Sequence, residues 1–435
     1  MPARPLDVLG DYGLSARTGF LPEEAPLTRL PDDYYEPWED LIQNLAQLVS
    51  SYKIRSRIDQ LPLLKTSRLK TEEEWRRAYV IMGCCVQAYI WVGETPSDRL
   101  PPQITIPLLD AASYLGLAPM NTYATIVLWN YGLLPGESDP TNPSNLRSTN
   151  TLTGTRTEEW FYLISVTLEA RGGPIITELL ECMSSVRQGD DAAVVASLER
   201  TACHIVAVGA LLNRMYEHCE AQPFYYDVRP LLSGTKGHAS LGLPKGVFYD
   251  EGDGKGSWRQ YAGGSNAQSS LIQFLDVALS VKHHATGQDG TLRRPSPSNR
   301  GFIEEMRQYM PGRHRDFLCH MEKQAHIREY AMSTEVSDPR VRAAYIEAVA
   351  ALTQFRNIHL RIVARYIISP SRQPVPENSK LKVGWNLAKT APNHNVGEED
   401  VAKLQGTGGT KLMAFLKQTR DETSMAAKFP EIASR

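Results

Sequence analysis

The sequence lacks the features of a secreted or organelle-targeted protein. Its 6 cysteines are spread over 435 residues, unlike the dense disulfide framework of a small secreted domain, so we expect reduced thiols. The N-terminal segment has no apolar core of signal-peptide length, and Asp7 and Asp11 are atypical of an organelle presequence. These absences predict a cytoplasmic protein.

Strong net charge and long apolar runs are also missing. There are 47 Lys and Arg against 49 Asp and Glu, a formal net charge of -2, which supplies no overall field to attract nucleic acid or an anionic membrane. Apolar stretches such as residues 79–92 are interrupted by Gly83 and Gln87 and are too short to span a bilayer. We expect a small-molecule partner, no nucleic acid and no membrane, and a monomer because no long exposed apolar pattern is present.

Metal and nucleotide fingerprints are absent as well. Cys203-His204 and His218-Cys219 resemble a zinc constellation, but CxxC spacing is missing and the two pairs are predicted to lie about four turns apart on one continuous helix. The glycine-rich segment 406–410 has neither the spacer nor the ending of a phosphate-binding loop. No flavin or dinucleotide fingerprint is present, so any redox chemistry implies an external electron donor.

What the sequence does contain is helical periodicity. Apolar residues recur at intervals of three and four along much of the chain, whereas alternating strand-like runs are scarce. Examples of this spacing are Leu41, Leu45 and Leu48, and Ile81, Cys85 and Tyr89. The pattern predicts a mostly α-helical fold.

Composition divides the chain into two parts. A segment rich in Ser, Thr, Asn, Pro and Gly reads as a linker at residues 141–157. It separates a smaller N-terminal helical domain, residues 1–140, from a larger C-terminal helical domain, residues 158–435. Within the larger domain, the polar stretch 371–410 is predicted to be a mobile loop.

One predicted helix, residues 341–368, carries a histidine on its apolar face. The segment has no Gly or Pro and is followed by Pro370. Its apolar stripe is Val341, Ala344, Ala348, Leu352, Phe355, His359, Ile362 and Tyr366. Such a histidine is usually a core residue with a satisfied hydrogen bond. A haem needs the same situation, a neutral imidazole projecting from a rigid helix into an apolar cavity, so both interpretations stay open.

Two other segments suit an aromatic ligand. Phe224 and Arg229 lie five residues apart and could stack on a ring and pair with a carboxylate, although a core phenylalanine near a surface arginine gives the same pattern. The small residues of segment 261–270 would let a backbone approach a flat ligand closely, or would simply form a tight turn and helix cap.

Taken together, these segments resemble the indoleamine 2,3-dioxygenase family over most of residues 120–425. The matching segments occur in family order and include Ala-Gly-Gly-Ser-Asn-Ala-Gln-Ser-Ser at 262–270, Arg-His-Arg-Asp-Phe-Leu at 313–318 and the histidine helix from Arg356. The fourth is the block from Gly406 through Thr423. Further matches lie at 173–176 and 224–237. Coincidence does not explain four such blocks in order.

The resemblance implies a two-domain helical fold with haem b in the larger domain and the smaller domain covering its distal side. His359 matches the proximal iron ligand. The residues it places near the haem are Leu163, Gly264, Ser265, Asp276, Arg356 and His359. The residues it places around substrate are Tyr123, Phe161, Ser165, Phe224, Arg229, Ser265, Asn266 and Thr407, the last on a loop that closes over the site.

The implied reaction inserts both atoms of dioxygen across the C2–C3 bond of L-tryptophan to give N-formylkynurenine, with ferrous haem and dioxygen as co-substrate. Arg229 would hold the substrate carboxylate, Phe161 and Phe224 would sandwich the indole, and Ser165 and Ser265 would supply nearby hydroxyls. No histidine matches the distal side, so no side-chain base for the indole N–H is expected.

Two departures from the family pattern leave alternatives open. Thr235 stands where a tryptophan is common, and Asn266 stands where a small residue is usual. They motivate a haem enzyme that oxygenates or hydroxylates a different indole. A haem-dependent sensor and a cofactor-free helical scaffold are further alternatives. Ligation of the iron by Cys319 is disfavoured, since the glycine-rich cysteine loop of thiolate-haem enzymes is missing.

Overall fold

The computed structural model describes residues 6–286, 292–293, 301–333, 336–374, 376–377, 379, 406–407 and 411–428. The chain is mostly helical, as the periodicity predicts. The longest helices are α5 (Glu72–Trp91), α8 (Gly172–Gln188), α9 (Asp191–Asn213) and α16 (Arg340–Val363), with α7 (Arg156–Ala170) and α19 (Leu412–Ala426) nearly as long.

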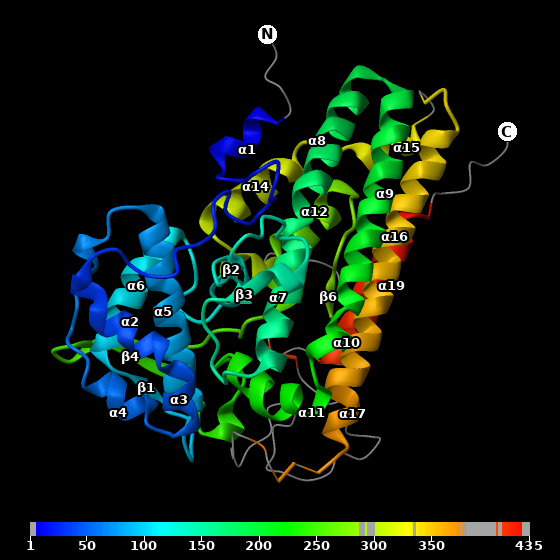
Figure 1. The fold of residues 1–435 in the computed structure, drawn as a ribbon. Helices are drawn as coiled ribbons and strands as arrows, with labels where there is room; N and C mark the ends of the chain where they lie inside the picture. The colour runs from blue at the N-terminus through cyan, green and yellow to red at the C-terminus, as the bar shows by residue number, and fades with distance from the viewer. Residues whose placement is uncertain are drawn as a thin grey trace.

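The N-terminal helices form the smaller group, drawn in blue and cyan at one side of the molecule (Figure 1). They are α2 (Glu36–Gln43), α3 (Leu45–Ser50), α4 (Ile54–Asp59), α5 and α6 (Pro102–Leu115). α2 and α5 are joined by a buried ion pair, in which Arg77 Nη2 lies 2.6 Å from Glu39 Oε2. Leu41, Leu45, Ile81 and Cys85 of the predicted apolar spacing are buried.

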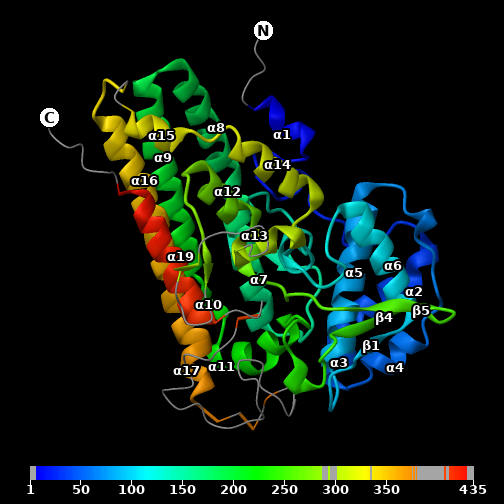
Figure 2. The same cartoon turned by 180° about the vertical axis from the view of Figure 1, so that it is seen from behind.

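The larger group is organised around α9, α16 and α19, which run side by side in both views (Figures 1 and 2). Segment Asp191–His218, α9 with the short α10 (Met215–His218), is the one described stretch long and apolar enough to cross a membrane, and half of its apolar window is buried. This segment of 28 residues is longer than residues 79–92, the apolar stretch named from the sequence. Because α9 packs against α8 and α16, its apolarity is that of a core helix.

The predicted linker is packed. It contains β3 (Leu146–Ser148), which pairs antiparallel with β2 (Tyr131–Leu133), and α7 begins within it at Arg156. The buried Asn130 side chain donates to the carbonyl of Asn150 at 2.9 Å and accepts from its N–H at 2.9 Å. The connection is therefore no free tether, and the division into two domains stays a prediction.

Distant segments cross between the two groups. β4 (Val247–Gly252) and β5 (Lys255–Arg259) form a hairpin whose first strand pairs parallel with β1 (Arg99–Leu100). Near the N-terminus, α1 (Asp7–Asp11) and the following loop lie beside α14 (Gly312–Glu322), as both views show (Figures 1 and 2). The remaining elements are α11 (Ala221–Pro223), α12 (Ser270–Ala278), α13 (Phe302–Met306), α15 (Ile327–Met332), β6 (Ala285–Thr286) and β7 (Leu292–Arg293).

The predicted histidine helix is confirmed with one correction. α16 continues through a π-helical turn, η10 (Ala364–Ile368), into α17 (Ser369–Ser371), so helical structure passes Pro370 instead of stopping before it. Pro370 falls in the first turn of α17, where its missing N–H needs no partner. Of the predicted mobile loop 371–410, residues 375, 378, 380–405 and 408–410 lie outside the described part of the chain.

Candidate active site

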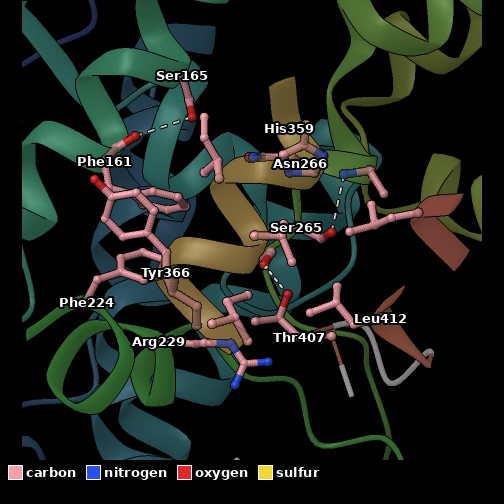
Figure 3. Close-up of a pocket in the computed structure, with 18 of the residues that line it drawn as sticks. Phe161, Ser165, Phe224, Arg229, Ser265, Asn266, His359, Tyr366, Thr407 and Leu412 are labelled. Carbon is pink, nitrogen blue, oxygen red and sulfur yellow. Dashed lines mark hydrogen bonds between the residues drawn. The ribbon is translucent and has the colours of Figure 1, made fainter. Parts of the chain in front are cut away.

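The histidine helix borders two adjoining cavities. The larger, of about 150 Å³, lies between α7, α16 and the first turns of α19 (Figure 3). The second has about 90 Å³ and shares several lining residues with the first, among them Ser165, Asn266 and His359. The apolar wall of the larger cavity includes Ile126, Ile164, Leu212, Met215, Leu232, Phe302, Ile362, Val363, Leu412, Phe415 and Leu416.

His359 faces both cavities from the apolar stripe of α16. Burial, and secondarily the charge of Arg356, lower the pKa of His359 to about 4, so the imidazole is neutral near pH 7. Its ring makes no hydrogen bond to any residue that the structure describes. A neutral, unpartnered imidazole in an apolar cavity is suited to binding a metal through a ring nitrogen.

α7 contributes one of its faces to the cavities. Phe161, Ile164 and Ser165 are spaced at three and four residues and line the larger cavity, and the Ser165 hydroxyl donates to the carbonyl of Phe161 at 3.4 Å (Figure 3). Leu163 is fully buried and lines neither cavity. Successive helical residues are about 100° apart, so Leu163 lies on the opposite face, and the expected contact with haem does not follow from this geometry.

The aromatic side chains form one wall. The rings of Phe161 and Phe224 lie 4.8 Å apart between centroids, and Tyr366 packs edge-on against Phe224 at 5.8 Å (Figure 3). A sandwiched indole needs its two neighbours about 7 Å apart, twice a stacking distance of van der Waals contact. In this arrangement the two phenylalanines therefore contact each other, and the expected sandwich is replaced by a single aromatic wall.

Arg229 is the cation of the larger cavity. It follows the π-helical turn η5 (Phe224–Val228) and is 3% exposed, with its guanidinium 5.7 Å from the ring centroid of Tyr225. Burial lowers the pKa of Arg229, and a guanidinium keeps its charge even so. It is the one arginine or lysine among the described lining residues of this cavity, whose other ionisable side chains are His359 and Tyr366. A buried cation in an apolar cavity favours an anionic ligand group.

The glycine-rich segment 261–267 lines the cavity and also packs tightly. Gly264, Ser265 and Asn266 line it directly. A Cβ on Gly263 would lie 2.2 Å from the carbonyl oxygen of Leu232, so a side chain is excluded there by the neighbouring backbone. The helix-cap interpretation is confirmed, since Ser265 accepts a hydrogen bond from the N–H of Ala267 at 3.3 Å. Close approach to a flat ligand stays a prediction.

Thr407 is joined to the same segment. Its hydroxyl donates to the carbonyl of Gly264 at 2.9 Å (Figure 3), and its own carbonyl accepts from the N–H of Gly263 at 3.1 Å. Gly406 and Thr407 line the larger cavity. One of these bonds is made by the side chain and the other by the backbone, so the position of Thr407 depends on the glycines as much as on its own side chain.

Tyr123 lines only the smaller cavity, and its hydroxyl donates to Glu169 Oε1 at 3.1 Å. Ser269 donates to the same oxygen at 2.5 Å, while Glu169 Oε2 has no partner among the described residues. Burial raises the pKa of Glu169 to about 7. The sequence analysis missed Glu169, whose one signal is a carboxylate among the apolar residues that end α7.

Arg356, one turn before His359 on α16, meets Asp276 of α12. Arg356 Nη2 lies 2.8 Å from both carboxylate oxygens of Asp276, and the arginine also donates to Thr423. His283 joins Asp276 to Glu422, with ring nitrogens 3.0 and 2.8 Å from the two carboxylates. Arg356 lines the smaller cavity, whereas Asp276 lines neither.

The ionisation of this network follows from its pairing. Burial acts to lower the pKa of His283, but the Asp276 and Glu422 carboxylates outweigh it and raise that pKa. Burial likewise opposes ionisation of Asp276 and Glu422, yet Arg356 and His283 lower the pKa of Asp276, and His283 lowers that of Glu422. The sequence analysis missed His283 and Glu422, which lie 139 residues apart in the chain.

The remaining expectations concern residues outside the cavities. Thr235 is buried and lines neither cavity, because its hydroxyl accepts from the N–H of Tyr261 at 3.1 Å. All six cysteines are free. No group of three potential metal-ligating side chains occurs in the described ranges, and the zinc candidates are separated by a helix break at Arg214, so they do not share one continuous helix.

Comparison with known proteins relates the whole chain to one family. The family model described as indoleamine 2,3-dioxygenase matches residues 8–426. Indoleamine 2,3-dioxygenase qulI of Penicillium citrinum is 42% identical, with 97% of this chain and 89% of that protein covered. Indoleamine 2,3-dioxygenase of Saccharomyces cerevisiae is 40% identical, with 98% and 94% covered. 6-Hydroxytryptophan 2,3-dioxygenase fscD of Fusarium equiseti is 38% identical, with 94% and 96% covered.

Proposed function

Because the chain belongs to the indoleamine 2,3-dioxygenase family, a family of haem-dependent oxidoreductases, we propose that it cleaves the indole ring of L-tryptophan to N-formylkynurenine. The observation that carries the proposal is the combination, in one apolar cavity, of a neutral imidazole and a single buried guanidinium. The first suits a haem iron and the second suits the carboxylate of an amino acid.

The residues around His359 fit haem b. The imidazole is neutral and without a partner in the described part of the chain, the walls are apolar, and Gly264 and Ser265 leave room for a flat ligand. His359 would hold the iron, Arg356 would face the propionate side from the smaller cavity, and Asp276 would act by holding Arg356. Bound haem supplies the iron that activates dioxygen for insertion of both oxygen atoms across the indole C2–C3 bond.

The chain's own residues would bind and orient the substrate. Arg229 pairs with the carboxylate, the wall of Phe161 and Phe224 packs against the indole, and the hydroxyls of Ser165 and Ser265 lie at the cavity surface. Holding the indole in one orientation and excluding water are the protein's main contributions to rate. The described lining offers no side chain to accept the indole proton, since His359 is reserved for iron and Arg229 cannot act as a base.

Closure of the cavity involves Thr407. Its two hydrogen bonds to Gly263 and Gly264 hold the start of the α19 region over the larger cavity, and Leu412, Phe415 and Leu416 add an apolar cover. The iron needs an electron donor from outside the chain. A cytoplasmic location and a monomeric state remain predictions from the sequence.

A second candidate substrate is a tryptophan with a polar group on its benzene ring. Asn266 lines both cavities, and its side-chain amide makes no hydrogen bond to the residues that the structure describes. An unpaired amide in an apolar cavity is costly and favours a ligand that supplies its partner. The Fusarium equiseti relative is named for 6-hydroxytryptophan, which agrees with a family tolerant of such a group.

The proposal is tested by the electron balance of the reaction. The haem-loaded chain, reduced once and supplied with L-tryptophan and air, should form N-formylkynurenine with one dioxygen consumed per tryptophan and no further consumption of reductant. A hydroxylase takes two electrons from the reductant in each turnover. Reductant consumption that keeps pace with product would therefore overturn the dioxygenase assignment.

A further inference from the structure

A separate pair of adjoining cavities lies away from the active site. One has about 300 Å³ and the other about 270 Å³, and neither shares a lining residue with the two cavities beside His359. They are joined through five residues that line both. These are Gly13, Glu72, Arg76, Trp129 and Arg313. The combined space is within the range of small-molecule sites.

The first of these cavities has an aromatic wall. Tyr12, Tyr114, Trp129, Leu115 and Pro311 line it, from the N-terminal loop, the end of α6, the segment before β2 and the start of α14. Trp129 is 3% exposed, so the wall is fixed by the core behind it. Such a wall suits a flat apolar group of a ligand.

The junction between the cavities carries excess positive charge. Arg313 Nη2 lies 3.2 Å from Glu72 Oε2, and Arg76 pairs with the other oxygen of the same carboxylate. Two guanidinium groups thus share one carboxylate. The Arg76 guanidinium lies 5.5 Å from the ring centroid of Trp129, and its buried Nε has no hydrogen-bond partner among the described residues.

The start of α14 adds to this positive field. The helix is 11 residues long and begins beside the cavity at Gly312 with no side-chain cap, so its first N–H groups are left for a ligand or water. His314 adds no charge, because burial lowers its pKa to about 3. The arginines and the helix end together favour a carboxylate at the junction.

The second cavity adds carboxylates beyond the junction. Besides the junction residues and Arg77, which pairs with Glu39, it is lined by Glu23, Glu24 and Glu73, with Pro22, Ala25, Pro26 and Leu27. Glu23 is paired with Arg17 at 2.7 Å, which leaves Glu24 and Glu73 as the other acids outside the junction. A cationic group next to the junction would lie beside these acids.

We propose that the two cavities form an accessory binding site for a free aromatic α-amino acid. Three environments adjoin one another there: an aromatic wall for the ring and, for the two groups on Cα, two arginines for the carboxylate with Glu24 and Glu73 for the ammonium group. Phosphate and other multiply charged anions suit it poorly, because Glu72, Glu24 and Glu73 would repel them. His359 lines neither of the two cavities. The accessory site therefore binds its ligand without taking part in the reaction at His359.

The test counts bound tryptophan. Equilibrium dialysis of the air-oxidised, haem-loaded full chain against L-tryptophan, under which no turnover occurs, should give two bound equivalents per chain. Arg313→Glu should weaken one of them by about ten-fold or more, because it replaces a charge-assisted partner with a repelling charge. Arg313 has a side chain 58% exposed, so the variant should fold normally. Arg200→Glu, at an arginine 51% exposed on α9, is the matched control and should leave both equivalents unchanged.

The ligand series sharpens the test. 3-Phenylpropionate lacks the ammonium group and 2-phenylethylamine lacks the carboxylate, so each should compete for the Arg313-dependent equivalent more weakly than L-phenylalanine. A single equivalent in the unmodified chain that Arg229→Ala removes would overturn the accessory site, as would inorganic phosphate competing as well as L-phenylalanine. If the unmodified chain binds only one equivalent, and this is the equivalent that Arg313→Glu weakens, the accessory site stands and the substrate assignment at Arg229 fails.

Discussion

Two neighbouring turns of α16 satisfy their polar groups in different ways. At one turn, Arg356 is held by Asp276 and Thr423, and His283 continues the chain of contacts to Glu422. One turn later, His359 faces apolar cavities without a hydrogen-bond partner in the described ranges, close to the unpaired amide of Asn266 (Figure 3). Buried polar groups are normally paired. The difference separates a paired network around Arg356, which also lines the smaller cavity, from an imidazole that is left for a ligand.

The sharpest way to break this comparison is to remove the imidazole. His359→Ala should abolish stoichiometric haem binding and lower product formation by more than about a hundred-fold, since the iron loses its protein ligand. Absorbance of bound haem and product assays measure both effects. His204→Ala on α9, which lines neither cavity, is the control. A variant that keeps full haem and activity would show that the unpaired imidazole is incidental.

Breaking the paired network around Arg356 should cost stability. Asp276→Ala leaves Arg356 and His283 buried without their carboxylate, which should lower the free energy of unfolding by about 3–5 kcal/mol. Urea denaturation measures this change. Arg156→Ala breaks an exposed pair with Glu159, 2.6 Å in length, and should cost less than about 1 kcal/mol. Equal effects from the two variants would show that the buried network contributes no more than a surface ion pair.

Glu169 predicts a pH dependence beside the smaller cavity. Burial raises the pKa of Glu169 from its ordinary value near 4.5 to about 7 in the folded chain. The neutral carboxyl therefore contributes its full stabilisation below about pH 4.5, and this contribution is lost as the pH rises through about 7. The protein should lose about 3 kcal/mol between pH 5 and 8 relative to Glu169→Gln. Urea denaturation of both proteins across this range gives the difference. Parallel curves would contradict a raised pKa.

Replacing Arg229 should weaken substrate binding without affecting haem binding. Arg229→Ala should raise KM about ten- to a hundred-fold through loss of a charge-assisted pair with the substrate carboxylate, while haem stays bound. Steady-state kinetics and haem absorbance separate the two readouts. Arg156→Ala again serves as the control. Unchanged saturation behaviour would remove Arg229 from the substrate site.

Replacing Asn266 should cause the smallest change, which affects the preference between two substrates. Asn266→Ala should lower kcat/KM for 6-hydroxytryptophan relative to tryptophan by about two- to ten-fold, if its amide pairs with the ring hydroxyl. Competition between the two substrates in one reaction measures the ratio directly. A ratio that does not change would assign Asn266 to the cavity surface without a role in selectivity.

Helical periodicity was enough to predict the main scaffold, whereas the cavity residues were predicted from the resemblance to a known family, and their roles stay predictions. Residues such as Phe161 and Ser165 share a helix face because of spacing alone, and the apolar stripe of α16 is buried as expected. The strands were missed because they are 2 to 6 residues long and depend on partners far away in the chain, as in the pairing of β1 with β4.

The site departs from the expected arrangement for a similar physical reason. The helix face of Leu163 turns it away from both cavities, and a phenylalanine sandwich requires a ring separation that the sequence does not specify. The contact of Leu163 with haem and the sandwiched indole stay predictions. Glu422 and His283 become visible only when α19 packs on α16 and the segment after α12 meets it, since nothing local marks either residue as part of the Asp276 network.

Dioxygenation of tryptophan in the cavity beside His359 is tested most directly by mass spectrometry of the product. The haem-loaded, reduced full chain is given L-tryptophan in isotopically labelled dioxygen. We expect N-formylkynurenine in which both oxygens from dioxygen are labelled. A product with one labelled oxygen, or tryptophan recovered unchanged from a haem-loaded chain, would contradict it.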